Sequence, residues 1–371
     1  MFTTSHDRSD ARGRLDLARL SSPGGIAAQI PARLGVRAPM ETFALTTDEQ
    51  DRWAQAFHGG LCVSDPRFER WAFGSAVLDA HSCFVLVAHL IGWWDLLSAE
   101  RIERQGATAE LRRFCQAAVA DPLVTIDPRR WAQFGCTLVE VMPDGEPYPV
   151  EVVDPHRPDG RLEVKPLMPC GRTFWFPAFD VISAALGSGR VPRIVRAIRY
   201  VPVGRQSGIR RRLHFLPGLV LDSQSDPGVA LVKHRFGAKS RGNLVLAAEL
   251  RVIAVSLVFG NLCRFDDIYG PDGVADERPG PWLCFPIASS VTAGSRLLLA
   301  ILDRFVRYWG SALAYCDTDS GIIPASPDGG TLVLPDGSTV RELSWADVDD
   351  VVGRFAALSP APWWPVWKVT R

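Results

Sequence analysis

Short apolar runs flank an acidic segment near the C-terminal end of the chain. Residues 311–314 and 321–325 are largely apolar, and the segment between them, Tyr315 to Ser320, reads Tyr-Cys-Asp-Thr-Asp-Ser. Two such runs around a tight turn predict a β-hairpin, and the period of two along a strand places Asp317 and Asp319 on one side of it. Two carboxylates there favour a bound cation. An ordinary Asp-rich turn is the alternative, because Asp, Thr and Ser favour turns through local hydrogen bonds.

The rest of the pattern predicts both strands and helices. An apolar strand from Trp71 runs into Asp79, and a helix-like run to Trp94 follows. Asp79 therefore stands at a strand end, where it acts either as a metal ligand or as the N-cap of the helix. Further helices are predicted over residues 51–58 (before the pair Gly59-Gly60), 229–262, 289–306 and 345–358, with a hairpin on 335–337 and a final strand from 367.

Basic residues gather in two places. Arginines alternate with apolar residues over 191–205, which is typical of a half-exposed strand. The arginines of this strand either contact a row of phosphate groups or lie at a solvent-exposed edge of a sheet, and we favour the sheet edge. Lys239 and Arg251 are twelve residues apart, a little over three helical turns, so both cations can point into one space from one helix or from a tight helical pair. That spacing suits a triphosphate, and a solvent-exposed charged face is the alternative.

Composition narrows the class of protein but not its chemistry. The 371 residues are 47% hydrophobic and 22% charged, which predicts a globular protein of two to three domains. We expect no membrane segment, no signal peptide and a cytoplasmic location. Lys+Arg and Asp+Glu are equal at 41 each, so net charge says nothing in favour of nucleic acid. The 8 cysteines contain no Cys-x-x-Cys pair, which argues against a zinc site and a disulfide framework.

The motifs, in this order, resemble the polymerase core of family B DNA polymerases, including the protein-primed group. Asp79 to Phe84 resembles the first palm motif, Asp-x-x-Ser-x-Tyr. Arg251 to Gly260 resembles the fingers motif, Lys-x-x-x-Asn-Ser-x-Tyr-Gly, with one extra residue. Tyr315 to Ser320 matches the third motif, Tyr-x-Asp-Thr-Asp-Ser. Phe57 to Gly60 is similar to the Tyr-x-Gly-Gly element that meets template DNA, so the resemblance extends over most of the chain.

The resemblance implies a two-metal phosphoryl transfer and a role for each matched residue. Asp79 and Asp319 would be direct ligands of two Mg²⁺ ions, with Mn²⁺ as a substitute, and Asp317 a secondary ligand. Phe84 would exclude a ribose 2′-OH. The implied nucleotide-binding residues are Ser82, Phe84, Lys239, Arg251, Ser256, Phe259 and Gly260, and the implied DNA-binding residues are Phe57, Gly59, Gly60, Tyr315 and Lys368.

The implied fold is α+β: a right-hand polymerase core with an antiparallel palm sheet backed by helices, and helical fingers. We expect an irregular lead-in over residues 1–50, the first part of the palm over 51–104 and an insertion over 105–228. The fingers helices follow over 229–265, and the second part of the palm, with a truncated start of the thumb, over 266–371. The family's exonuclease domain and most of its thumb are expected to be absent.

Two functions remain open at this level. One is a template-directed DNA polymerase core that acts on template-primer DNA and deoxynucleoside triphosphates. The other is a catalytically inactive remnant that binds DNA or a partner protein, which is favoured by Val255 in place of the fingers Asn and by the short distance from Lys368 to the end of the chain. A reverse transcriptase is disfavoured, because Thr318 separates acids that are adjacent in that class.

Further partners are expected by resemblance alone. A terminal (priming) protein and a separately encoded exonuclease or thumb are the alternatives. A bacterial nucleoid, plasmid or phage association is the expected setting.

Overall fold

The computed structural model describes residues 22–69, 72–153, 162–216, 218–269 and 275–371. Within these, the chain forms two compact units. We call them the sheet unit (residues 46–92, 104–201 and 285–371) and the helix-pair unit (described residues up to 45, 93–103 and 202–284). Each unit draws on separated stretches of sequence, so neither corresponds to one of the expected domains. The palm and fingers assignments stay predictions.

The sheet unit contains a mostly antiparallel seven-stranded sheet. Five strands run side by side in the order β1, β13, β14, β2 and β17, and the far end of β14 pairs in parallel with β16, which pairs with β15. The bounds are β1 Cys62–Ser64, β2 Ser75–Ala80, β13 Tyr315–Asp317, β14 Ser320–Ser326, β15 Gly330–Val333, β16 Thr339–Ser344 and β17 Trp367–Thr370.

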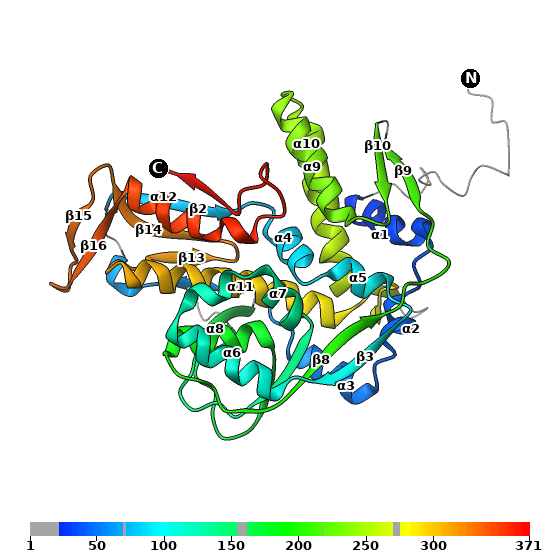
Figure 1. Cartoon of the computed structure of the whole chain (residues 1–371), viewed down its shortest axis with the longest axis horizontal. Coiled ribbons are helices and arrows are strands. Elements are labelled where there is room, and N and C mark those ends of the chain that lie inside the picture. Colours follow the sequence, from blue (N-terminus) through cyan, green and yellow to red (C-terminus); the bar gives the residue numbers. More distant parts are fainter. Residues whose placement is uncertain (1–21, 70–71, 154–161, 217, 270–274) are drawn as a thin grey trace. The chain divides into compact units, whose positions relative to one another are not determined.

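One long helix, α11 (Phe285–Tyr308), forms the core of the sheet unit and runs beneath β13 and β14 (Figure 1). The hydroxyls of Ser290, Thr292 and Ser295 bond back to carbonyls of the helix, as Ser290 Oγ does to Pro286 O at 2.6 Å, and Ser289 Oγ donates to Trp53 O, so these groups can be buried. The other helices of the unit are α3 Thr47–Gln55, α4 Cys83–Leu90, α6 Thr108–Ala120, α7 Pro128–Phe134, α8 Ala178–Ser188 and α12 Trp345–Gly353.

A second sheet has the strand order β3, β8, β4, β7. The arginine-rich strand β8 (Ile194–Val203) lies between β3 and β4, so its prediction as a strand is confirmed but its prediction as a sheet edge is wrong. Its arginines are accommodated because they pair across the face, as Arg196 does with Glu140 at 3.6 Å. The bounds are β3 Arg101–Gly106, β4 Thr137–Val141 and β7 Phe174–Pro177, and a separate hairpin comprises β5 Tyr148–Val153 and β6 Leu162–Leu167.

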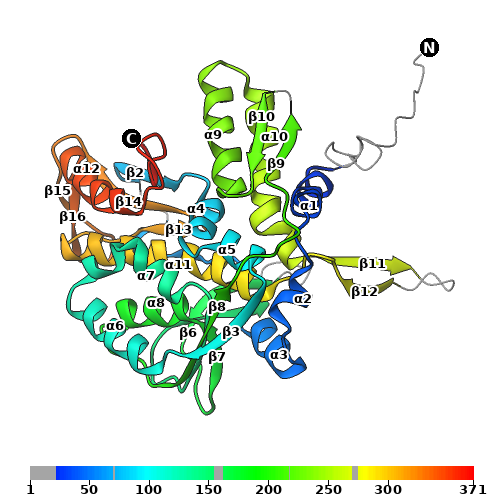
Figure 2. The ribbon, with the colours of Figure 1, turned by 45° about the vertical axis from the view of Figure 1, so that its right-hand side comes forward.

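The helix-pair unit is named for α9 (Pro227–Ser240) and α10 (Leu244–Val258), which pack side by side next to the β9–β10 hairpin (Figure 2). Trp93 Nε1 donates to the α9 N-cap, Asp226 Oδ1, at 3.0 Å, and Trp94 Nε1 donates to Ser223 O at 2.6 Å. The remaining bounds are α1 Pro23–Leu34, α2 Pro39–Phe43, α5 Trp93–Ser98, β9 Arg212–Leu216, β10 Leu219–Asp222, β11 Phe265–Tyr269 and β12 Ala275–Pro279.

Two sequence expectations about helices need correction. The lead-in is not irregular where it is described, because α1 and α2 occupy it; residues 1–21 lie outside the described residues. Ser22 caps α1 by accepting from Gly25 N–H, and Gly35 ends it at φ 82°, although Pro31 inside the helix obscures the pattern. The expected helix before Gly59-Gly60 begins earlier and ends at Gln55.

One described helix, α11, is long and apolar enough by length and composition to cross a membrane, contrary to the expectation of no such run. Its most apolar window is 89% buried inside the protein. A buried core helix passes the same test, so the length and composition of α11 are weak evidence for a membrane segment.

Glu49 ties α3 to the second sheet. Burial raises the pKa of Glu49, but hydrogen bonds from Arg104, the Thr46 N–H and the Tyr200 hydroxyl outweigh that effect and lower it to about 2. We expect Glu49→Gln to cost about 1–3 kcal/mol of unfolding free energy near neutral pH. The stabilisation from a lowered carboxyl pKa is complete above the unfolded value of 4.5 and is lost as pH falls towards the folded value, so the cost should shrink as pH falls from 4.5 towards 2.

Urea unfolding of both proteins between pH 3 and 7 measures this difference. The exposed Asp51 on the same helix supplies the control, and Asp51→Asn should leave stability within about 0.5 kcal/mol of wild type. A cost for Glu49→Gln that does not depend on pH would contradict the proposed source of the stabilisation.

Candidate functional site

A row of side chains crosses five strands of the seven-stranded sheet at one level. Asp79 on β2 is directly opposite Ser320 on β14 and Lys368 on β17. Ser320 is in turn opposite Asp317 on β13, which is opposite Cys62 on β1. Directly opposed residues share a face of the sheet, with neighbouring Cβ atoms roughly 4.5–5.5 Å apart. The first and third motifs, distant in sequence, therefore lie on neighbouring strands.

The hairpin of β13 and β14 turns through two residues, Thr318 and Asp319. Asp319 is thus a turn residue, and strand alternation does not determine which side its carboxylate faces. The prediction that alternation places Asp319 on the same side as Asp317 is therefore wrong in its reasoning. The backbone of Asp319 is fixed all the same, because Ala80 N–H donates to Asp319 O at 2.8 Å. This bond holds Asp319 next to the residue that follows Asp79.

Two of the three non-glycine residues with positive φ in the described chain flank this point. Thr318 has φ 54° and Ser82 has φ 53°. A β-branched residue in this region is a genuine outlier, at a cost on the order of 1 kcal/mol, and such strain tends to gather at functional sites. Thr318 is held there by its N–H, which donates to Leu61 O at 2.8 Å, and by its Oγ1, which donates to Asp317 Oδ1 at 2.9 Å.

The turn between β2 and α4 is fastened by the C-terminal segment. His81 N–H donates to Val366 O at 2.9 Å, and the buried Trp364 donates from Nε1 to His81 O at 2.8 Å. Ser82 begins α4 without a side-chain cap, and Phe84 lies half-buried in the first turn. Asp79 is the last but one residue of β2, so the N-cap role left open for it belongs to Ser82 instead.

The charges of the acids act on nearby thiol and phenol groups. Burial raises the pKa of the Cys83 thiol, and the carboxylates of Asp319 and Asp79 raise it further. A hydrogen bond with Cys62, together with burial and the charge of Asp317, raises the pKa of Tyr315 to about 12. Both groups therefore stay protonated at neutral pH.

The three carboxylates are the type of ligand that Mg²⁺ prefers, but they do not form a closed coordination shell. Asp79 and Asp317 are exposed and Asp319 is half-buried, so water can reach all three. Throughout the described chain, no three His, Cys, Asp or Glu side chains are grouped closely enough to hold a metal ion. Mg²⁺ is commonly held by one or two protein carboxylates plus waters and substrate phosphates, and Asp79 with Asp319 can supply that number.

The Phe57–Gly60 segment runs from α3 to β1 and reaches the hairpin. Phe57 packs against Phe285, with ring centroids 5.6 Å apart. Gly60 lies so close to the turn that a Cβ on it would be 2.3 Å from Thr318 Oγ1 and 2.9 Å from Thr318 Cβ. The glycine is therefore required by close approach to the hairpin and does not serve as the stop signal of α3, which ends four residues before the Gly59-Gly60 pair.

The residues of the middle motif lie in the helix-pair unit, not in the unit that carries the acids. Lys239 is in the last turn of α9 and Arg251 is in α10, so they occupy a helical pair and not one helix. Both are exposed. Ser256, Phe259 and Gly260, at the C-terminal end of α10 and just beyond it, are half-buried.

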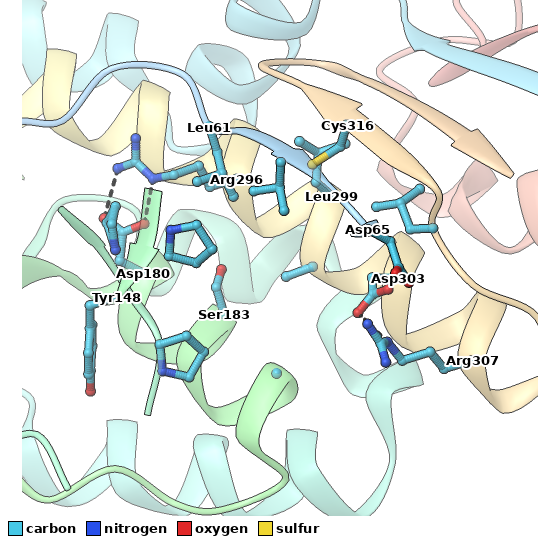
Figure 3. Close-up of a pocket in the computed structure, with 17 residues that line it drawn as sticks. Leu61, Asp65, Tyr148, Asp180, Ser183, Arg296, Leu299, Asp303, Arg307 and Cys316 are labelled. Atoms are coloured by element: carbon cyan, nitrogen blue, oxygen red, sulfur yellow. Dashed lines mark hydrogen bonds and ion pairs between the residues drawn. The ribbon is translucent and has the colours of Figure 1, made fainter. Parts of the chain in front are cut away.

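A cavity of about 310 Å³ lies on the other side of the same strands. Cys316, Leu61 and Val63 line it, and each is next in sequence to Asp317 or Cys62 of the acidic row. Figure 3 shows Leu61 and Cys316 at this cavity. At one end it contains Arg296 and Asp180, a buried ion pair that sequence reasoning missed. A lone arginine within the apolar run 289–302 was the available signal.

Comparison with known proteins gives structural likeness only. No family model and no curated protein matches the chain. A phi29 DNA polymerase complex with primer-template DNA and incoming nucleotide substrates is similar, with TM-score 0.43 and 12% identity over 82% of this chain and 50% of that chain. Its orthorhombic crystal form gives TM-score 0.42 and 11% identity over 86% and 56%.

The chain thus spans about half the length of these polymerase chains. At these identities and TM-scores, neither the activity nor any residue role of those polymerases transfers to this chain.

The contact between Gly60 and Thr318 can be tested by a double-mutant cycle. We expect Gly60→Ala to cost about 1–3 kcal/mol of unfolding free energy, because the rigid Thr318 side chain cannot move aside. Thr318→Gly should remove the clash and suits a positive φ, so the two changes should couple by at least about 1 kcal/mol in thermal or urea unfolding. Gly59→Ala is the control, since its Cβ would meet only Val164 Cγ2 at 3.8 Å. Strictly additive costs would contradict the contact.

Proposed function

We propose that the chain is the catalytic core of a template-directed DNA polymerase of the family B type. One observation carries this proposal: Asp79 on β2 and Asp317 on β13 flank the same strand, β14, of one antiparallel sheet, and the Thr318-Asp319 turn joins β13 to β14. Acids that share a metal site must converge from separate strands, and the pairing of β2 with β14 provides that convergence. The motif resemblance supplies the reaction class.

The proposed reaction joins a nucleotide to a primer end by in-line displacement at the α-phosphate, with pyrophosphate as the leaving group. Bound Mg²⁺ ions would stabilise the charge that develops on the attacking and leaving oxygens. Asp79 and Asp319 would hold the ions, and Asp317 would add negative charge beside them. Lys368, opposite Asp79 across the strand pair, is exposed and free of any ion pair within the described chain, so its ammonium is available to a DNA phosphate.

Each unit carries residues that the motif resemblance assigns to the incoming nucleotide. Phe84 and Ser82 follow Asp79 at the start of α4 and would face the sugar of the incoming nucleotide. Lys239 and Arg251, exposed on α9 and α10, would bind its triphosphate. Arg251 in place of the family's Lys keeps the charge and adds a planar, bidentate donor, while Val255 removes a polar side chain from the same helix.

Primer extension tests the acids. We expect Asp79→Asn and Asp319→Asn each to slow extension by at least about 10³-fold in Mg²⁺, because losing a ligand removes several kcal/mol of transition-state stabilisation. Asp328→Asn, an exposed carboxylate in the turn after β14, should keep wild-type activity. Extension by Asp319→Asn within tenfold of wild type would contradict the assignment. DNA binding without any extension by the wild type would favour the remnant function.

The cations of the helix pair have a separate kinetic signature. We expect Arg251→Ala and Lys239→Ala to raise KM for the deoxynucleotide about 10- to 100-fold, the loss expected for one charge-assisted hydrogen bond. Lys233→Ala, another exposed lysine on α9, should leave KM unchanged and serves as the control. Steady-state incorporation of a single nucleotide measures all three. Unchanged KM in both test variants would remove the helix pair from the nucleotide site.

A further inference from the structure

The indole of Trp364 is buried beside the turn that joins β2 to α4. Trp364 is 0% exposed, and its Nε1 donates to His81 O at 2.8 Å. The residue is itself anchored, because Trp364 N–H donates to Ala361 O at 2.9 Å and Trp364 O accepts a bond from Ser359 Oγ at 2.6 Å. The backbone bonds of Trp364 therefore fix the side chain that holds His81 O.

The bond to His81 O sets the orientation of the peptide group between His81 and Ser82. A peptide group is planar, so the only rotation that joins it to the Ser82 Cα is the φ angle of that residue. On the other side, Ser82 O accepts the N–H groups of Val85 and Leu86 at 2.9 and 3.0 Å, which fixes Ser82 to α4. With both sides fixed, Ser82 is held at φ 53° and ψ 45°.

This conformation of Ser82 is strained, because it lies in the left-handed region that side chains other than glycine rarely adopt. Such a conformation persists only where the surrounding bonds over-determine it. The second of these bonds joins His81 N–H to Val366 O at 2.9 Å, and β17 pairs with β2 directly beyond it (Figure 1). Without the bond to the Trp364 indole, rotation of the peptide would relieve the strain and displace the start of α4.

The start of α4 carries a residue that the motif resemblance assigns to the sugar of the incoming nucleotide. Phe84 lies half-buried in the first turn of α4, two residues after Ser82. By that resemblance its ring excludes a ribose 2′-OH. Steric exclusion depends on the position of the ring, so a displacement of this turn would make room for the hydroxyl.

We propose that Trp364 is a positioning residue that determines the discrimination between deoxyribonucleoside and ribonucleoside triphosphates. Trp364 does not touch the nucleotide; it acts through the His81–Ser82 peptide and the first turn of α4. This inference rests on the proposed function, because it needs an incoming nucleotide at Phe84.

The test is the ratio of kcat/KM for dGTP to kcat/KM for GTP, measured by single-nucleotide primer extension with the full chain in Mg²⁺. Partial unfolding lowers both values by the same factor and leaves the ratio unchanged, so the ratio reports positioning and not stability. Trp364→Phe removes the indole N–H and keeps an aromatic ring. We expect it to lower the ratio about 3- to 10-fold, the effect of losing one neutral hydrogen bond.

Two further variants make the test specific. Trp363→Phe is the matched control, because its ring stacks on that of Trp364 with centroids 5.8 Å apart, whereas the indole bonded to His81 is that of Trp364. We expect the wild-type ratio for this control. Phe84→Ala should itself lower the ratio, and adding Trp364→Phe to it should lower the ratio no further, because both changes act on the same contact.

Three results would overturn the proposal: a wild-type ratio in the folded Trp364→Phe variant, an equal fall in Trp363→Phe, or the full additional fall in the Phe84→Ala background. Absence of any incorporation by the wild type would overturn the proposed function as well, whereas a wild-type ratio in Trp364→Phe would overturn the inference alone.

If Trp364→Phe does not fold, site-specific replacement of Trp364 by benzothienylalanine gives the answer. This amino acid keeps the bicyclic shape of the indole and replaces only its N–H. We expect the same fall in the ratio, and a wild-type ratio would overturn the proposal.

Discussion

The antiparallel pairing of β14 with β2 is the interaction on which the candidate site depends. Its register places Ser320 opposite Asp79, and a shift by one residue would move Asp79 to the other face of the sheet, because side chains alternate with a period of two. The buried residues between, such as Leu78 and Ile323, penalise such a shift, since it would bring them to the surface. The position of the acidic row is therefore secured by the hydrophobic packing below it.

Beneath the sheet, α11 combines an apolar surface with satisfied polar groups. The hydroxyls of Ser290, Thr292 and Ser295 bond within the helix, and its one deeply buried charge, Arg296, pairs with Asp180 and also donates to backbone carbonyls. The helix thereby connects α8 to the Gly59-Gly60 segment through a polar contact in an otherwise apolar layer. A polar contact is directional, so it can orient a backbone segment in a way that apolar packing cannot.

Much of the element pattern could be predicted from the sequence, and the failures have physical causes. The strand before Asp79, the acidic hairpin, the hairpin on Asp336 and the last strand are present, because each shows apolar periodicity bounded by turn residues. The sequence pattern of the lead-in does not predict α1, because Pro31 lies inside that helix. The alternating arginines of β8 predict a solvated edge strand, but β8 lies between two other strands, where an ion pair with Glu140 accommodates one of its arginines.

The candidate site, like the fold, has features that the sequence predicts and features that only the tertiary structure decides. The sequence by itself determined which residue types could act, because Asp79 and the Asp-Thr-Asp turn stand at the ends of apolar strands, where local chemistry is readable. It could not determine that Asp79 and Asp317 share one row of the sheet, nor that Arg296 donates to the carbonyls of His58 and Gly59. Those relations join residues far apart in the chain, and only the pairing of strands and the burial of α11 decide them. Hydrophobic periodicity reports which face of an element is buried, whereas the partner on that face is set by tertiary packing.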